Sequence, residues 1–186
     1  MDFFYDKSNP KVKEKSYGKL AVQQRMSLAM AFLNPLRPII AETWLGYGKG
    51  NKSKAFGQAL KKLIQDAVAG QYPNQRIVPE HVAVSIGMLP SVEIQDVVHG
   101  PQELEIYFTS VENPLALPAD EVLLVVYSPE AGIAGRNTHT CTRNEGYIKV
   151  DLPSQLRTAP FHAYLVVHSA GKKQYSKSVY AGQLGP

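Results

Sequence analysis

The stretch at residues 121–127, EVLLVVY, decides how this chain folds, because apolar side chains fill nearly every position of it. Successive side chains of a β-strand point to opposite faces of a sheet. A strand with one solvated face therefore alternates apolar and polar residues, whereas this run is apolar on both faces. That pattern is typical of a central strand. We therefore expect residues 121–127 to lie in the middle of a sheet.

Runs with a period of two lie on both sides of this stretch and predict further strands. We expect these at residues 92–98, 103–109, 136–142, 146–152, 161–168 and 174–181, with another at 80–88. Turn signals such as HGPQ and RNEG separate them. Seven strands at this spacing between residues 92 and 181 are typical of an immunoglobulin or fibronectin III-like sandwich.

The run at residues 161–168 predicts which of its side chains face the interior. Phe161, Ala163, Leu165 and Val167 form one face, while the alternate positions include His162 and His168. We expect the first set to line the core, because a slip of one residue would bury both histidines instead.

The N-terminal part is predicted to be helical, because apolar residues recur there at spacings of three and four. Three stripes carry this pattern: Val22, Met26, Met30 and Leu33; Leu36, Ile39, Ile40 and Trp44; and Phe56, Ala59, Leu60, Leu63, Ile64 and Ala67. Pro35 separates the first two, since the residue before a proline avoids helical geometry. The fold class is therefore α+β, a helical N-terminal segment followed by an antiparallel immunoglobulin/fibronectin III-like β-sandwich. We expect a mainly helical region at 1–89 that ends in a strand, and a sandwich at 90–186.

A glycine-rich loop, LGYGKGNKSKAF at residues 45–56, invites comparison with phosphate-binding loops. A P-loop needs four residues between its glycines, then Gly-Lys-Ser/Thr. Here three residues separate Gly46 from Gly50, and Asn51 stands before Lys52. A helix rather than a strand precedes the loop, which also excludes a dinucleotide fingerprint. We expect a turn whose Asn51 or Ser53 caps the next helix.

Composition indicates an ordinary folded protein without a membrane span. Of 186 residues, 44% are hydrophobic and 19% charged, and no run approaches the roughly 18 apolar residues that a span requires. Cys141 is the single cysteine, so no internal disulfide can form. Residues 1–70 hold 12 Lys and Arg against 5 Asp and Glu, which makes this half basic.

No catalytic, cofactor or metal site is predicted. His162 and His168 share a strand face but are separated by roughly 20 Å at about 3.3 Å per residue. His139 and Cys141 could share a zinc ion, which usually needs three or four protein ligands, and no spacing brings in the others. We expect a surface histidine beside a buried thiol.

Four segments of the chain form a distinctive pattern: QQRMSLAMAFLNPLRPII (23–40), NKSKAFGQAL (51–60), VPEHVAVSIGML (78–89) and LPSQLRTAPFHAYLVVHSAGKKQYSKSVYAG (152–182). The last of them contains Leu152, Pro153, Tyr164, Ser176, Ser178 and Tyr180. In these segments and residues the chain resembles an uncharacterised domain-of-unknown-function family that is widespread in Bacteroidetes. The resemblance implies an all-β C-terminal half and no known catalytic residue, cofactor or substrate.

We interpret the chain as a non-enzymatic structural or interaction module with a protein partner, of the kind found in cell-surface or phage and mobile-element assemblies. The loops at 112–120 and 129–137 are expected to present its binding surface. One alternative is a glycan-binding module that uses exposed aromatics, for which Tyr107, Tyr127, Tyr147 and Tyr164 are candidates. The other is weak, non-specific nucleic-acid binding by Lys49, Lys52 and Lys54, which ranks last because interleaved aromatics are missing.

Overall fold

The helices and strands follow one another along the chain in two groups. The computed structural model describes residues 16–171 and 174–185. Its helices are α1 (Tyr17–Leu33), α2 (Arg37–Thr43), α3 (Lys52–Asp66) and α4 (Ser154–Arg157), with 3-10 turns η1 (Pro79–His81) and η2 (Arg143–Glu145). Its strands are β1 (Val68–Ala69), β2 (Arg76–Ile77), β3 (Val92–His99), β4 (Glu103–Ser110), β5 (Glu121–Ser128), β6 (Ile133–Arg136), β7 (Tyr147–Asp151), β8 (Phe161–His168) and β9 (Val179–Leu184). The α+β class is thereby confirmed.

Two antiparallel sheets form the sandwich. One has the order β3-β4-β7 and the other β6-β5-β8-β9, so that β5 and β8 are the central strands of the larger sheet. Their register pairs Val125 with Tyr164. The inner core lies between the sheets, and β8 contributes Phe161, Ala163, Leu165 and Val167 to it. The expected inward face of residues 161–168 is therefore confirmed.

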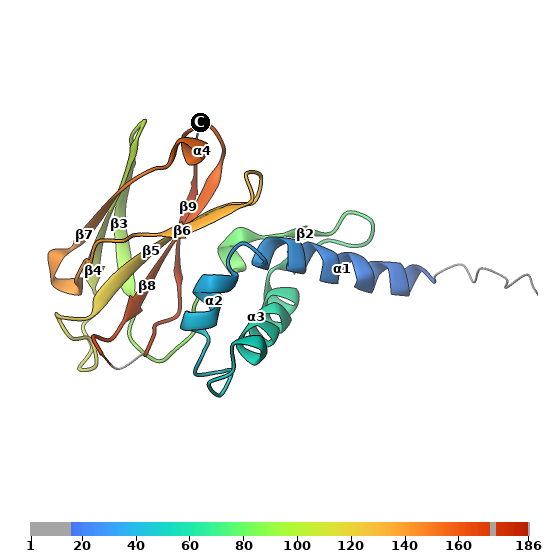
Figure 1. Cartoon of the computed structure of the whole chain (residues 1–186), viewed down its shortest axis with the longest axis horizontal. Helices are drawn as coiled ribbons and strands as arrows, with labels where there is room; N and C mark the ends of the chain where they lie inside the picture. The colour runs from blue at the N-terminus through green and yellow to red at the C-terminus, as the bar shows by residue number, and fades with distance from the viewer. Residues whose placement is uncertain (1–15, 172–173, 186) are drawn as a thin grey trace, which may run out of the picture.

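A second core covers the outer face of the larger sheet. Val125, Tyr127, Tyr164 and Val166 are buried there among side chains of the helices, including Phe32, Leu33, Ile40, Trp44 and Phe56. Figure 1 shows the helical layer on the side of β6, β8 and β9, away from β3, β4 and β7. The molecule therefore has three layers, and the helices and the sandwich share one of its two cores. The division at residues 89 and 90 stays a prediction.

The helices follow their predicted stripes with one exception. Leu36, Ile40 and Trp44 are buried around α2. The Asn51 side chain accepts a hydrogen bond from the Lys54 amide at 3.0 Å and thereby caps α3, as expected of the glycine loop. On α1, however, Val22 and Met26 are exposed, because only the C-terminal part of this helix lies against the sheet, where Ala29, Phe32 and Leu33 are buried. No described helix has the length and hydropathy of a membrane span.

The expected strand at residues 80–88 is not a strand. Residues 79–81 form η1, and residues 82–89, which we call the crossing segment, run from the helices to the sandwich without joining a ladder. Serine hydroxyls provide its partners instead. Val84 N donates to Ser178 Oγ at 3.1 Å, and Ser85 Oγ donates to the Ser176 carbonyl at 2.8 Å. Val82 and Val84 are buried, so the period of two reflects burial rather than sheet pairing.

Two further strands differ from their expected bounds. The strand expected at residues 136–142 is not formed at those bounds, because β6 ends at Arg136. This strand lies instead within residues 129–137, where a loop was expected. The ladder is interrupted there because the Asn137 side chain accepts from Leu124 N at 2.8 Å in place of a backbone carbonyl, and the chain pairs with β5 again at Cys141 and Thr142. The strand expected at residues 174–181 begins later, at Val179, and is β9. Before it, the Ser176 Oγ accepts from Val167 N at 2.9 Å and so takes the place of a backbone carbonyl.

Gly87 lets the crossing segment pass close to the chain that leads into β9. A Cβ atom at this position would lie 1.8 Å from the Tyr175 carbonyl oxygen, which is backbone and cannot swing aside. The same carbonyl accepts from Leu89 N at 3.1 Å. Any side chain at position 87 would therefore separate two segments that the hydrogen bonds hold together.

We predict that Gly87→Ala lowers the free energy of unfolding by at least about 2 kcal/mol, the scale of a backbone strain or overpacking defect. The control is Gly57→Ala on the exposed face of α3, where a Cβ meets nothing within 4 Å. It should stabilise by about 0.5–1 kcal/mol, because alanine favours helix. Urea unfolding followed by circular dichroism measures both, and equal effects would contradict the close approach.

Candidate interaction surface

Two of the four tyrosines expected at a glycan surface are buried. Tyr127 and Tyr164 are 1% and 0% exposed, so that expectation was wrong for them. Tyr127 packs edge-to-face on Phe32, and the Tyr164 hydroxyl donates to the Pro79 carbonyl at 2.9 Å. Burial raises the pKa of Tyr127 to about 12 and also raises that of Tyr164. Both side chains join the sheet to the helical region.

The other two tyrosines lie exposed on the outer face of the smaller sheet. Tyr107 and Tyr147 stack at 6.0 Å between ring centroids. The Lys149 ammonium, 2.9 Å from Glu105, keeps the pKa of that carboxyl below its usual value, and the Tyr107 hydroxyl, which donates to it at 2.9 Å, adds to this effect. Lys149 also pairs with Glu103 at 2.7 Å. The polar groups of this face are therefore largely satisfied by one another.

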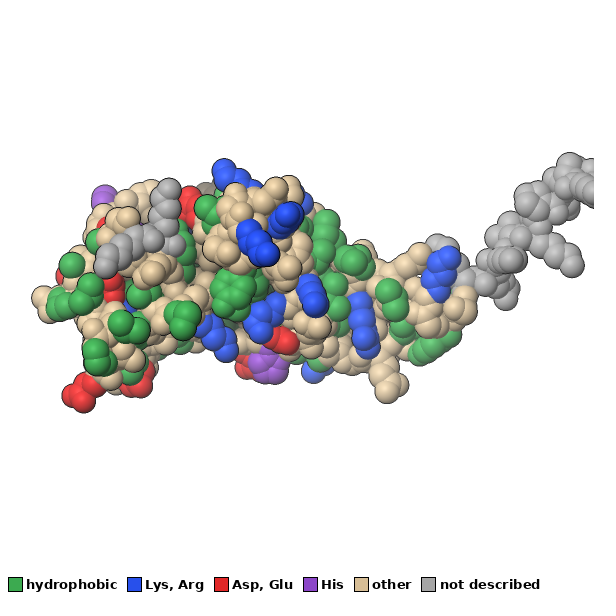
Figure 2. Space-filling model, turned by 90° about the horizontal axis from the view of Figure 1, so that it is seen from below, with side chains coloured by type: hydrophobic (Ala, Val, Ile, Leu, Met, Phe, Trp, Pro, Cys, Tyr) green, Lys and Arg blue, Asp and Glu red, His purple; other side chains and the backbone are tan. Residues whose placement is uncertain are grey.

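The three lysines proposed as candidates lie together around the turn between α2 and α3. Lys49, Lys52 and Lys54 are exposed, and none forms an ion pair with a described residue. Lys62, further along α3, instead pairs with Asp66 at 2.6 Å. Figure 2 shows Lys and Arg side chains gathered over the helical layer on this face, with Asp and Glu concentrated towards the end of the sandwich.

Histidine and cysteine form no metal-binding group among the described residues. His139 is exposed, whereas Cys141 is buried and donates to the Tyr147 carbonyl at 3.1 Å. Burial raises the pKa of the Cys141 thiol to about 11. His162 points away from the inner core but is buried beside Tyr180 of β9, whose ring centroid lies 6.0 Å from the imidazole and whose hydroxyl lies 3.0 Å from Nδ1, so it is not exposed as its outward position implied. His168 pairs with Glu121 at 2.9 Å.

An apolar groove of about 670 Å³ lies where the helices meet one end of the sandwich. Its walls come from the α2–α3 turn, the crossing segment, the β4–β5 loop (111–120) and the chain on either side of the β8–β9 turn. Four large apolar side chains in it are exposed: Met88 at 91%, Leu115 at 63%, Tyr47 at 52% and Leu117 at 51%. We call this the junction groove.

A second hollow of about 490 Å³ adjoins the junction groove, because Gly46 and Tyr175 line both. Lys52 and Glu42 are its charged residues. Glu42 is neutralised by Arg136, with which it forms an ion pair. In the junction groove itself the charged lining residue is Asp120, whose side chain is 2% exposed and faces Arg143. Lys52 is therefore the unneutralised charge along the combined surface.

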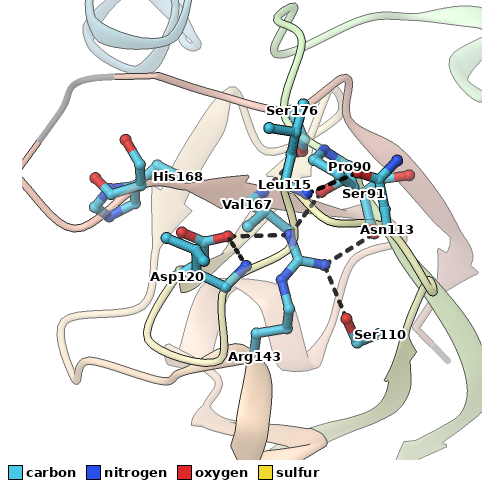
Figure 3. Close-up of polar contacts among 12 residues, drawn as sticks. Pro90, Ser91, Ser110, Asn113, Leu115, Asp120, Arg143, Val167, His168 and Ser176 are labelled. Carbon is cyan, nitrogen blue, oxygen red and sulfur yellow. Dashed lines mark hydrogen bonds and ion pairs between the residues drawn. The ribbon is translucent and has the colours of Figure 1, made fainter.

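Arg143 holds the β4–β5 loop in place beneath the groove. Its guanidinium donates to the carbonyls of Pro90 (2.7 Å) and Ser91 (3.1 Å) and pairs with the Asp120 carboxylate at 3.5 Å (Figure 3). The same carboxylate accepts from Leu117 N at 3.0 Å. One buried cation on η2 thus connects the loop to the chain that directly follows the crossing segment, so Leu115 and Leu117 are presented from a braced loop.

Sequence patterns did not indicate the groove or its brace. Arg143 and Asp120 lie 23 positions apart, in a turn and at a loop end, where no periodicity operates. Met88 lies in the run that predicted a strand at residues 80–88, and its side chain is 91% exposed in the structure. The one available signal was the loop at 112–120, whose Leu115 and Leu117 are large apolar residues among turn formers.

Seven antiparallel strands in a three-plus-four arrangement define an immunoglobulin/fibronectin III-like sandwich, here with a helical layer on the larger sheet. The chain belongs to DUF6266, a family of unknown function whose model matches residues 1–182. This agrees with the resemblance to an uncharacterised family, whereas its distribution in Bacteroidetes stays a prediction.

Two solved structures are similar to part of the chain. One is domains d3–d4 of the rat CD45 extracellular region, at 12% identity and a TM-score of 0.39, with 54% of this chain and 51% of that chain covered. The other is domains A168–A170 of titin, at 12% identity and a TM-score of 0.37, with 63% of this chain and 37% of that chain covered. The chain thus spans about half or less of either structure. No curated protein matches it.

We predict that Arg143→Gln lowers the free energy of unfolding by about 3–5 kcal/mol, because it leaves the Asp120 carboxylate buried without its counter-charge. The matched control is Arg136→Gln, which breaks the exposed pair with Glu42 and should cost less than about 1 kcal/mol. Chemical unfolding of both variants makes the comparison. Similar losses would show that the buried cation does not brace the loop.

We predict that the buried His162 makes the free energy of unfolding of this protein depend on pH. Burial lowers its pKa below the usual 6.5, so below pH 6.5 the unfolded chain binds a proton that the folded chain does not. The free energy of unfolding should therefore fall as the pH drops below about 6.5. Unfolding at pH 7.5 and pH 5.5 should show a smaller difference for His162→Gln than for the unaltered protein, and an equal difference would contradict the effect of burial.

Proposed function

We propose that this protein is a non-enzymatic interaction module that binds a partner protein through the junction groove. The observation that carries the proposal is the convergence of Tyr47, Met88, Leu115 and Leu117 around one hollow while each remains largely exposed. Single exposed apolar residues are ordinary, but contiguous apolar patches mark interaction sites. Burying such side chains against a partner supplies the favourable free energy of association.

The support for a protein partner also comes from how the groove is built. Arg143 braces the β4–β5 loop, and the hydroxyl of Thr43 on α2 donates to the Val84 carbonyl of the crossing segment at 2.7 Å. The walls are therefore held in position before any partner arrives. A preformed surface loses less conformational entropy on binding, which strengthens an association of given area.

The titratable groups around the groove favour binding over catalysis. Asp120 accepts from Leu117 N and faces Arg143, and Glu42 pairs with Arg136. A general acid or base needs a free proton-accepting atom within reach of a substrate. These carboxylates are instead engaged by protein groups, which is the arrangement of a structural site.

A glycan-binding role is the second candidate, and the stacked pair of Tyr107 and Tyr147 is the observation that favours it. Sugar rings pack on exposed aromatic faces, and two such faces lie side by side here. The pair ranks behind the groove because Tyr107 donates to Glu105 and each ring already covers part of the other. A setting in a cell-surface or phage and mobile-element assembly remains a prediction from the sandwich class alone.

Site-specific photo-crosslinking tests the proposed function. A photoreactive residue placed at Leu115 or at Met88, in cells of the source organism, should crosslink the same partner protein. The matched control position is Val98, an exposed apolar residue on β3. The purified partner should then bind Leu115→Asp at least about tenfold more weakly than the unaltered protein, the loss expected for a central apolar anchor.

Equal crosslinking from Val98 and Leu115 would contradict the groove as the binding surface. So would full affinity of the Leu115→Asp variant for the partner, provided that its circular dichroism and melting temperature match those of the unaltered protein.

A further inference from the structure

The crossing segment offers unused backbone groups along the junction groove. Residues 86–88 line the groove, yet none of them forms a backbone hydrogen bond with another described residue. Hydrogen bonds resume on either side, where Ser85 O accepts from Ser178 N at 3.3 Å and Leu89 N donates to Tyr175 O at 3.1 Å. Unpaired backbone amides and carbonyls beside an apolar hollow are the elements of recognition by strand addition.

The electrostatics of the groove favour a partner that carries a carboxylate. Lys52 lines the adjoining hollow without an ion pair among the described residues, while the acidic lining groups are Glu42, paired with Arg136, and the buried Asp120. Glu112 lies exposed on the β4–β5 loop but is not among the lining residues. A carboxylate at the Lys52 end would therefore meet a net positive surface.

The backbone conformation of Lys49 indicates that its positive charge has a functional role. Lys49 has a φ of +50°, in the left-handed region where glycine is the least strained residue. It stands between Tyr47, which lines the junction groove, and Gly50, which lines the adjoining hollow. Non-glycine residues held in this region are commonly tied to function. Lys49 thus adds a second positive charge to the same turn, three positions before Lys52.

We infer that the occupant of the junction groove is an extended, acidic and apolar segment of the partner protein. This inference rests on the proposed function. The backbone of the segment pairs with that of residues 86–88, its alternate apolar side chains pack among Met88, Leu115 and Tyr47, and a flanking carboxylate meets Lys49 and Lys52. At about 3.3 Å per residue, three residues of the crossing segment pair with about three residues of such a segment.

Selection from a random peptide library displayed on phage, with the full-length protein as bait, tests this inference. Peptides that still bind the Met88→Asp variant are removed. The enriched sequences should alternate apolar residues and carry Asp or Glu at one end. The best peptide is then synthesised, and its affinity is measured by fluorescence anisotropy.

Charge variants on one helix separate a specific contact from general attraction. Lys52→Glu should weaken the peptide at least tenfold, and added salt should reduce this difference. The matched control is Lys61→Glu, an exposed lysine further along α3, which should leave the affinity unchanged. Lys49→Gly should weaken the peptide while the melting temperature stays equal or rises, because glycine relieves the positive φ.

Peptides methylated at single backbone nitrogens test the strand pairing. Every second methylation should abolish binding, and the positions between should tolerate it, because alternate amides of a strand point towards the paired backbone. Enriched peptides without acidic residues, equal effects of Lys52→Glu and Lys61→Glu, or methylation without alternation would each overturn the inference. So would tight binding of a single-stranded DNA probe at physiological salt through Lys52, which would assign the lysines to nucleic acid.

The two proposals fail separately. A groove-dependent partner found by crosslinking, together with peptides of another chemistry, would leave the interaction module standing and remove the acidic extended segment. Absence of any groove-dependent partner would remove the proposed function itself, whatever peptides the library yields.

Discussion

The central strands β5 and β8 carry apolar side chains on both faces, and the rest of the structure depends on this constraint. A sandwich needs one apolar face per sheet, yet Tyr127, Tyr164 and Val166 make the outer face of the larger sheet apolar as well. Each such side chain gains about 1.5–3 kcal/mol on burial, while a whole domain is stable by only about 5–15 kcal/mol. The outer face therefore requires a cover, and α1, α2 and α3 provide it.

Much of the fold could be predicted from the sequence, because burial on one face imposes periodicity on β4, β7 and the buried helix faces, and burial on both faces makes β5 a continuous apolar run. The errors occurred where side chains replace backbone partners. Ser178 and Ser85 tie down the crossing segment, so its alternation imitates a strand, and Asn137 ends β6 although the sequence predicted a strand at residues 136–142. Val22 and Met26 follow a helical stripe correctly but extend beyond the sheet that the stripe would cover.

The candidate surface could be predicted far less well. Local patterns showed that Tyr127 and Tyr164 belong to strands, but not that a separate helical layer covers their face. The junction groove forms from segments around residues 47, 88 and 115, which no local pattern brings together. The residues that carried the family resemblance have structural roles here: Ser176, Ser178 and Tyr164 link the sandwich to the crossing segment and η1. They therefore indicate how the layers are joined rather than what is bound.

Because β8 contributes alternate side chains to both cores, the helical layer and the sandwich depend on each other and should evolve together. Loss of the helices by gene truncation would expose Tyr164 and Val166 to water, and the bare sheet would be prone to aggregate. A descendant with a free-standing sandwich would first need polar residues at every second position of β5 and β8. Several coordinated substitutions separate the two forms, so the helices and the sandwich should be inherited as one unit.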